Sequence, residues 1–289
     1  MTAPVVVGVD GTDSGLDAVA LAVRLSQATG DPLLVVCVYP EEPRPGAGAD
    51  EEVERHAGAV LEAARASVGA DGTAGYRAVP STSPARGLAE LAERDGAGIV
   101  VVGSSNRGAI GRVVSGSTAE RLLHGTGCPV AVAPRGYRRR TDPLRALAVA
   151  YVDTPEGHEA VRVAADLAVR SGLPLTLHSV IAVSTNWFVP PAVRHDDEAL
   201  VPEEVRQAYQ KALDEALARV PVGVRPAAEL HYGDVVDELS MLGERGADLL
   251  VCGSRRYGPV RRVLLGSVSS ALVRQSSVPV LVVPRGGAE

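Results

Sequence analysis

Two glycine- and serine-containing loops carry the strongest chemical signal in this chain of 289 residues. The first runs from Gly103 to Ser117 and the second from Gly253 to Ser267, and each follows a strongly apolar run. A loop with several glycines lets the backbone approach a ligand closely and turn its N–H groups toward an anion. A helix that starts near Ser117 or Ser267 would add unpaired N–H groups and a partial positive charge. Each loop therefore predicts a phosphate-binding site.

A second loop in each half is expected to face the same site. Asp10 to Gly15 follows the first apolar run, and a carboxylate there suits ribose hydroxyls or an adenine amino group. Val38, at the end of the second apolar run, would offer apolar contact to a base. In the second half Asp153 and Val180 are interpreted as taking those places, and the stretch from Asp153 to Gly157 is one residue shorter than the stretch from Asp10 to Gly15. The candidate nucleotide-binding residues are Val9, Asp10, Gly11, Thr12, Val38, Gly103, Ser104, Asn106, Arg107, Gly108, Gly116, Ser117 and Thr118, followed by Val152, Asp153, Val180, Gly253, Ser254, Arg256, Gly258, Gly266, Ser267 and Val268.

The elements that position these loops alternate between strand and helix. The run 5–9 predicts a buried strand, 16–28 keeps helical spacing, and 99–102 predicts the strand that enters the first glycine loop. The order repeats from Ala146 to Cys252. Such alternation predicts a parallel sheet with helices on both faces, whose ligands bind beyond the carboxyl ends of the strands.

The repetition indicates an internal duplication, because both copies of the loop continue through Pro-Val-x-Val to Pro-Arg-Gly. A repeat of this length corresponds to a complete domain rather than to a solenoid unit. We predict a first domain over 1–137, a linker over 138–144 and a second domain over 145–289. The basic residues of the linker, Arg138 to Arg140, are interpreted as solubilising charge. The Ser-x-x-Glu spacing from Ser117 to Glu120 predicts a capping box at the start of a helix.

Composition excludes several classes of protein. Hydrophobic residues make up 46% of the chain but aromatic ones only 3%, so Val, Leu and Ala must build the cores. The net charge of -6 argues against a nucleic-acid-binding surface. Lys211 is the only lysine, which excludes a Walker-type phosphate loop. No apolar run approaches the length of a membrane span and the start lacks a basic signal region, so we expect no membrane partner and a cytoplasmic location.

The cysteines and histidines give no sign of a metal centre. Cys37, Cys128 and Cys252 are expected to be buried free thiols. The histidines are interpreted as scattered residues without metal-ligand spacing, so neither a metal site nor a catalytic residue is expected. Only His178 and His231 are expected near a cleft.

These motifs resemble the universal stress protein family in its tandem form, and the resemblance covers nearly the whole chain. The family's nucleotide signature is G-x2-G-x9-G-(S/T), with a strand-one Val-Asp-x-(S/T) region nearby. Both halves depart from it at the second glycine, where Asn106 and Arg256 stand. The positions that match the signature are Gly103, Gly116 and Ser117 in the first half and Gly253, Gly266 and Ser267 in the second.

The resemblance implies two tandem, doubly wound, five-stranded parallel-sheet domains of the Rossmann-like, adenine nucleotide alpha hydrolase-like type, with strand order 3-2-1-4-5. It also implies binding of ATP or AMP, with ADP as an option and Mg²⁺ as a companion of ATP. Domains of the family pair through their last strand. The apolar edges 130–133 and 280–283 fit that pairing, so we predict a homodimer or a pseudo-dimeric monomer.

Three functions remain open on the sequence. The leading hypothesis is a stress-response regulator or interaction protein that binds adenine nucleotide without turnover, so that the chain is at most a weak ATPase. The second is an enzyme, either a slow ATP hydrolase or a nucleotidyl transferase, that would use Asp10 and Asp13. The third is a nucleotide-free interaction protein that keeps only the fold, which the missing second glycine favours. Asn106 tolerates a left-handed turn and Arg256 could supply a phosphate charge, so we rank the first site above the second.

Overall fold

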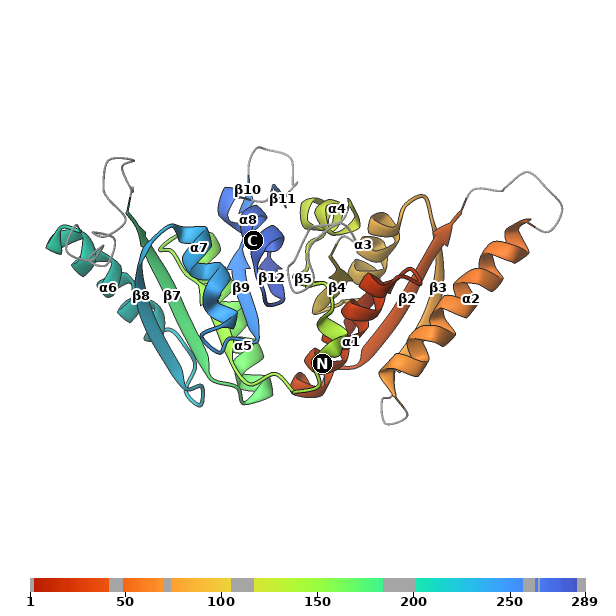
Figure 1. The fold of residues 1–289 in the computed structure, drawn as a ribbon, viewed down its shortest axis with the longest axis horizontal. Helices are drawn as coiled ribbons and strands as arrows, with labels where there is room; N and C mark the ends of the chain where they lie inside the picture. Colours follow the sequence, from red (N-terminus) through yellow and green to blue (C-terminus); the bar gives the residue numbers. More distant parts are fainter. Residues whose placement is uncertain are drawn as a thin grey trace.

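A ten-stranded sheet, in the order β3-β2-β1-β4-β5-β12-β9-β6-β7-β8, forms the centre of the computed structural model (Figure 1). The structure describes residues 3–41, 49–69, 74–104, 117–183, 201–256, 263–264 and 266–284. Each half contributes one set of five neighbouring strands, and both sets follow the order 3-2-1-4-5. The predicted fold class and strand order are confirmed.

The first half alternates strand and helix as its apolar periodicity predicts. The helix after β1 begins behind Thr12, whose side chain accepts a hydrogen bond from Gly15 N, and it ends at Gly30, which has φ 73°. The elements are β1 (Val5–Val9), α1 (Asp13–Thr29), β2 (Leu33–Pro40), α2 (Ala49–Val68), β3 (Ala74–Ser81), α3 (Pro84–Asp95), β4 (Ile99–Gly103), α4 (Ser117–Gly125) and β5 (Val130–Ala133).

The second half repeats this order after a short 3-10 turn, η1 (Tyr137–Arg139). The helix expected over 234–245 is shorter, because the chain tightens into a second 3-10 turn before Gly246, at φ 97°. The elements are β6 (Leu147–Ala150), α5 (Pro155–Ser171), β7 (Leu175–Ala182), α6 (Glu203–Leu217), β8 (Pro226–Gly233), α7 (Val235–Ser240), η3 (Met241–Gly243), β9 (Leu249–Gly253), β10 (Arg255–Arg256), β11 (Val263–Leu264), α8 (Ser267–Gln275) and β12 (Val280–Val283).

The two halves join through their last strands, which the sequence identifies as apolar edges. β12 pairs antiparallel with β5, with Leu281 opposite Ala131. An ion pair between Arg170 on α5 and Asp31, in the turn between α1 and β2, also crosses between the halves. The chain is thus a pseudo-dimer built on one continuous sheet, while association between two chains stays a prediction.

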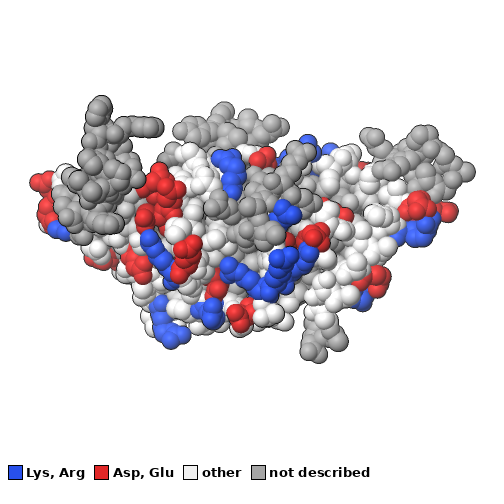
Figure 2. Space-filling model, viewed as in Figure 1, with Lys and Arg blue, Asp and Glu red and all other residues white. Residues whose placement is uncertain are grey.

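The segment 136–138, where the first domain passes into the linker, is docked on α1 rather than standing free. Tyr137 is buried, and the Asp17 carboxylate accepts hydrogen bonds from Gly136 N (2.7 Å) and Arg138 N (2.9 Å). The Arg138 guanidinium also pairs with Asp13 at 2.8 Å. The basic residues of the linker remain exposed, and acidic and basic side chains are interspersed across the face drawn in Figure 2.

Two apolar layers cover the faces of the sheet. Side chains of α1, α2, α5 and α6 pack on one face, and those of α3, α4, α7 and α8 pack on the other. The expectation of free thiols holds, with Cys37 and Cys252 buried and Cys128 half-buried. Among the described helices, none has the length and apolar character needed to cross a membrane.

Candidate functional site

A cavity of about 330 Å³, here called the first cavity, opens at the carboxyl ends of β1 and β4. Nine of the first-half candidates lie in the described part of the chain, and eight of them line this cavity. Gly11 is the exception, and its φ of 79° identifies it as a turn glycine. The eight are Val9, Asp10, Thr12, Val38, Gly103, Ser104, Ser117 and Thr118.

The turn after β1 holds a carboxylate at this cavity. Asp10 Oδ1 accepts hydrogen bonds from Thr12 N (3.1 Å) and Thr12 Oγ1 (2.6 Å). Thr12 Oγ1 in turn accepts from Gly15 N at 3.2 Å and so caps α1. Asp10 is exposed, so its carboxylate is available to a ligand's hydroxyl or amino groups.

The glycines that end β4 and β9 serve helix packing rather than a left-handed turn. A Cβ at Gly103 would overlap the backbone carbonyl of Ser14, and one at Gly253 would lie 2.5 Å from Glu156 O. Neither glycine has a positive φ. In each half the first turn of a helix therefore rests directly on the end of a central strand, which glycine alone permits.

The serines that directly follow these two glycines differ in their access to the cavities. Ser104 lines the first cavity, whereas Ser254 does not line the second. Ser104 and Ser254 are buried, and neither hydroxyl oxygen has a hydrogen-bond partner among the described residues. α4 starts at Ser117, where the sequence predicts a helix N-terminus, and the capping box between Ser117 and Glu120 stays a prediction. Gly266 takes the cap position of α8. Asn106, Arg107, Gly108, Gly116 and Gly258 lie outside the described residues, and Arg256 is placed only by its backbone in β10.

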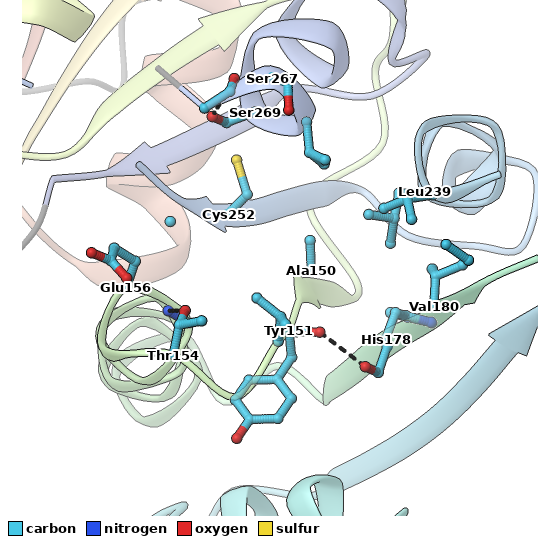
Figure 3. A pocket seen from close by; sticks show the side chains of 18 of the residues that line it. Ala150, Tyr151, Thr154, Glu156, His178, Val180, Leu239, Cys252, Ser267 and Ser269 are labelled. Carbon is cyan, nitrogen blue, oxygen red and sulfur yellow. Dashed lines mark hydrogen bonds between the residues drawn. The ribbon is translucent and has the colours of Figure 1, made fainter. Parts of the chain in front are cut away.

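A second cavity, of about 270 Å³, occupies the corresponding place in the second half. Figure 3 shows Thr154 and Glu156 on one side, Cys252 between, and Ser267 and Ser269 on the other. The candidates that line it are Val152, Val180, Gly253, Gly266, Ser267 and Val268. Asp153 and Ser254 are not among the residues that line it.

Strand register corrects the alignment of the two halves. Val5 pairs with Ile99 in β4, and Leu147 pairs with the corresponding Leu249 in β9. The caps agree, because Thr154 accepts from Gly157 N as Thr12 does from Gly15 N. The two turns thus have equal length, and Val152 stands where Asp10 stands. The interpretation that put Asp153 in that place is wrong.

Asp153 instead belongs to a polar cluster beside the cavity. Its Oδ1 lies 2.8 Å from His158 Nε2 and 3.5 Å from the Tyr151 hydroxyl. Burial, followed by the charge of Asp153, raises the pKa of Tyr151 to about 12. The Tyr151 hydroxyl therefore stays protonated at neutral pH.

The second half has a pair of histidines at two strand positions that valines occupy in the first half. His178 lines the cavity, and its Nδ1 lies 2.9 Å from His231 Nε2. Burial lowers the pKa of His178 to about 4, and burial likewise lowers the pKa of His231. The expectation of scattered histidines is wrong for these two. The two histidines meet because β7 pairs with β8. In the sequence, the signal for this cluster was the placement of Glu229 and His231 two positions apart on one strand, which puts both side chains on the same face.

Comparison with known proteins agrees with this architecture. The model of the "Universal stress protein family" matches residues 1–134 and 144–284. Universal stress protein Rv2005c of Mycobacterium tuberculosis is 30% identical over 294 residues, covering 96% of this chain and 96% of the relative. Rv2319c of the same organism is 34% identical over 206 residues, covering 70% of this chain and 69% of the relative.

The fold is shared with a solved structure. The crystal structure of a universal stress protein from Archaeoglobus fulgidus superposes with a TM-score of 0.71 at 18% identity, covering 98% of each chain. Together with the family match in both halves, this establishes that the chain belongs to the universal stress protein family.

Proposed function

We propose that the first cavity binds an adenine nucleotide, ATP, AMP or ADP, and that the protein acts in the cytoplasm as a nucleotide-dependent regulator or interaction protein of the stress response. The observation that carries this proposal is the convergence of the eight first-half candidates on one cavity. Its volume of about 330 Å³ lies in the range of small-molecule sites.

The walls of the first cavity offer a different surface to each part of a nucleotide. Val36, Val38 and Leu88 form an apolar wall for the base. Asp10 would accept hydrogen bonds from ribose hydroxyls or the adenine amino group. Ser117 and Thr118, at the first turn of α4, provide backbone N–H groups and hydroxyls for the phosphates. Mg²⁺ would enter as the companion of the ATP phosphates.

Binding without turnover is the better supported form of this proposal. A hydrolase would need a positioned base, for which Asp10 and Asp13 are the candidates. The Asp13 carboxylate pairs with Arg138 instead, and that hydrogen bond lowers the pKa of Asp13. Asp10 Oδ1 accepts two hydrogen bonds from Thr12, which hold the carboxylate in the turn and leave Oδ2 to accept from a bound ligand. The contacts of Asp10 with the turn and of Asp13 with the linker thus account for both carboxylates without a catalytic role.

The test compares the same substitution in the two halves. We expect Asp10→Ala to weaken binding of ATP or AMP about tenfold or more, because a hydrogen bond to a charged group contributes about 1.5–3 kcal/mol. Asp153→Ala is the matched control and should leave the affinity unchanged, since Asp153 contacts His158 outside the cavity. Isothermal titration with each nucleotide measures both. Equal effects of the two substitutions, or no binding to the wild-type chain, would overturn the proposal.

A further inference from the structure

Three metal-ligating side chains converge on one face of the sheet beside the second cavity. His178 on β7 lies in register with Glu229 on β8, and Val180 with His231. Residues two apart on a strand point to the same side, so the side chains at 178, 229 and 231 share a face. His178 Nδ1 is 2.9 Å from His231 Nε2, and Glu229 Oε2 is 3.5 Å from the former and 3.7 Å from the latter.

The spacing of these three atoms matches metal coordination. A point equidistant from atoms with these separations lies about 2.0 Å from each, and zinc binds imidazole nitrogen at about 2.0–2.1 Å and carboxylate oxygen at about 2.0–2.2 Å. One ion could therefore contact all three atoms with little movement of the strands.

The chemistry of the three donors selects the type of ion. Two imidazoles and one carboxylate suit zinc and its neighbours, whereas Mg²⁺ and Ca²⁺ prefer oxygen ligands throughout. A metal binds the lone pair of an imidazole nitrogen, and His178 Nδ1 and His231 Nε2 are the two nitrogens that face each other here. Glu229 has 54% of its side chain exposed, which leaves room for water in the remaining coordination positions.

We propose that His178, His231 and Glu229 bind one divalent transition-metal ion of the zinc class, at the edge of the second cavity. The ligand atoms are His178 Nδ1, His231 Nε2 and the Glu229 carboxylate. The site is independent of nucleotide binding in the first cavity, so either can fail without the other.

Two charged residues tune this site. Arg245 lies 2.9 Å from His231 Nδ1, where its N–H donates to that nitrogen. A metal on Nε2 requires Nδ1 to carry the proton, so Arg245 must then move aside. Glu238 Oε2, which now accepts from Arg245 at 2.7 Å, lies 3.8 Å from Nδ1 and would accept that proton's hydrogen bond after a small approach. Arg245 therefore competes with the metal, and Arg245→Met should raise the affinity.

The first half provides variants that the fold already accepts. The positions equivalent to His178, Glu229 and His231 are occupied there by Val36, Arg77 and Val79. Valine thus fits both histidine positions in the same architecture. His178→Val and His231→Val remove a ligand while reproducing a packing that the other half uses.

The experiment titrates the metal-stripped full chain with Zn²⁺ alone, and Co²⁺ absorption spectra report the ligand set. We expect about one equivalent of Zn²⁺, with affinity lowered at least tenfold by Glu229→Gln and by His231→Val and raised severalfold by Arg245→Met. His56→Gln, which changes an exposed histidine on α2, is the control and should leave the titration unchanged. Circular dichroism of each variant confirms folding.

Two results would overturn the proposal. One is a wild-type chain that retains no Zn²⁺ in equilibrium dialysis against micromolar metal. The other is a bound ion whose affinity does not change in folded Glu229→Gln and His231→Val variants, because the ligands would then lie elsewhere. Nucleotide titrations of the same variants separate these outcomes from a failure of the first cavity.

Discussion

The first and second cavities occupy the same place in the same fold, and they differ in the side chains that a ligand would touch. Asp10 of the first is replaced by Val152 in the second, and Val36 by His178. Each first-turn hydroxyl, Ser117 and Ser267, is retained. After duplication, the polar groups of the walls have changed while the backbone around them has not.

What the halves share is what the fold requires. A glycine ends each fourth strand because a helix rests on it, and a threonine caps each helix that follows the first strand. Repeated motif residues are therefore weak evidence that both cavities bind the same ligand. The comparison predicts a loss of stability in both halves at the shared positions, and an effect confined to one half at the positions that differ.

The largest expected effect concerns the glycines at the strand ends. We expect Gly103→Ala and Gly253→Ala each to lower the free energy of unfolding by about 3 kcal/mol or more, because the added methyl group meets backbone that cannot move aside. The loss should be greater at Gly103, where the overlap with Ser14 is closer. Thermal unfolding of the three proteins measures both effects.

Gly125→Ala is the control for these variants. A Cβ at Gly125, at the end of α4, meets nothing within 4 Å, so the substitution should change the stability little. If Gly103→Ala were as stable as this control, the close packing of α1 on β4 would not hold in solution.

The next effect is found only in the second half, at His178. Its pKa is about 4 in the fold against 6.5 in an exposed histidine, so between these values the unfolded chain takes up a proton that the folded chain refuses. Stability is therefore fully present above pH 6.5 and falls as the pH drops toward 4. The free energy of unfolding should fall by about 3 kcal/mol, because each unit of pKa difference corresponds to about 1.4 kcal/mol.

Urea unfolding at pH 7 and at pH 4.5, with a metal chelator present, measures this loss. His178→Val should lose much less stability than the wild type between pH 7 and pH 4.5, because it lacks the histidine whose pKa is lowered. His56→Gln should lose as much stability as the wild type. A His178→Val profile that parallels the wild type would show that the imidazole is hydrated and charged in the folded protein.

The sequence predicts the fold and the first cavity well, for a local reason. Apolar runs and the glycines that follow them determine where strands and helices end, and parallel strands bring their carboxyl ends to one edge. Asp10, Val38 and Gly103 meet at that edge because Asp10 directly follows β1, Gly103 ends β4 and Val38 lies near the end of β2. No long-range pairing beyond the strand order is needed to bring them together.

The second cavity was less predictable because it depends on register. Asp153 resembles Asp10 in sequence, but it lies one residue later in its turn. Its carboxylate therefore contacts His158 and does not line the cavity. His178 and His231 are far apart in the chain and meet only because β7 and β8 align them. Strand pairing of this kind has no local signal, since a slip of one residue would turn each side chain to the other face.

The smallest predicted effect tests the shared caps. Thr154→Ala should cost about 1 kcal/mol of stability by removing the acceptor for Gly157 N. Thr12→Ala removes the same cap and also the 2.6 Å hydrogen bond to Asp10, so it should cost a little more and weaken nucleotide binding as well. Thermal unfolding of the two variants, with and without ATP, separates the contributions. If Thr154→Ala lost as much stabilisation by ATP as Thr12→Ala, the second cavity would bind the nucleotide without a carboxylate at the position of Asp10. The two cavities would then differ in their affinity for one ligand rather than in the ligand that they bind.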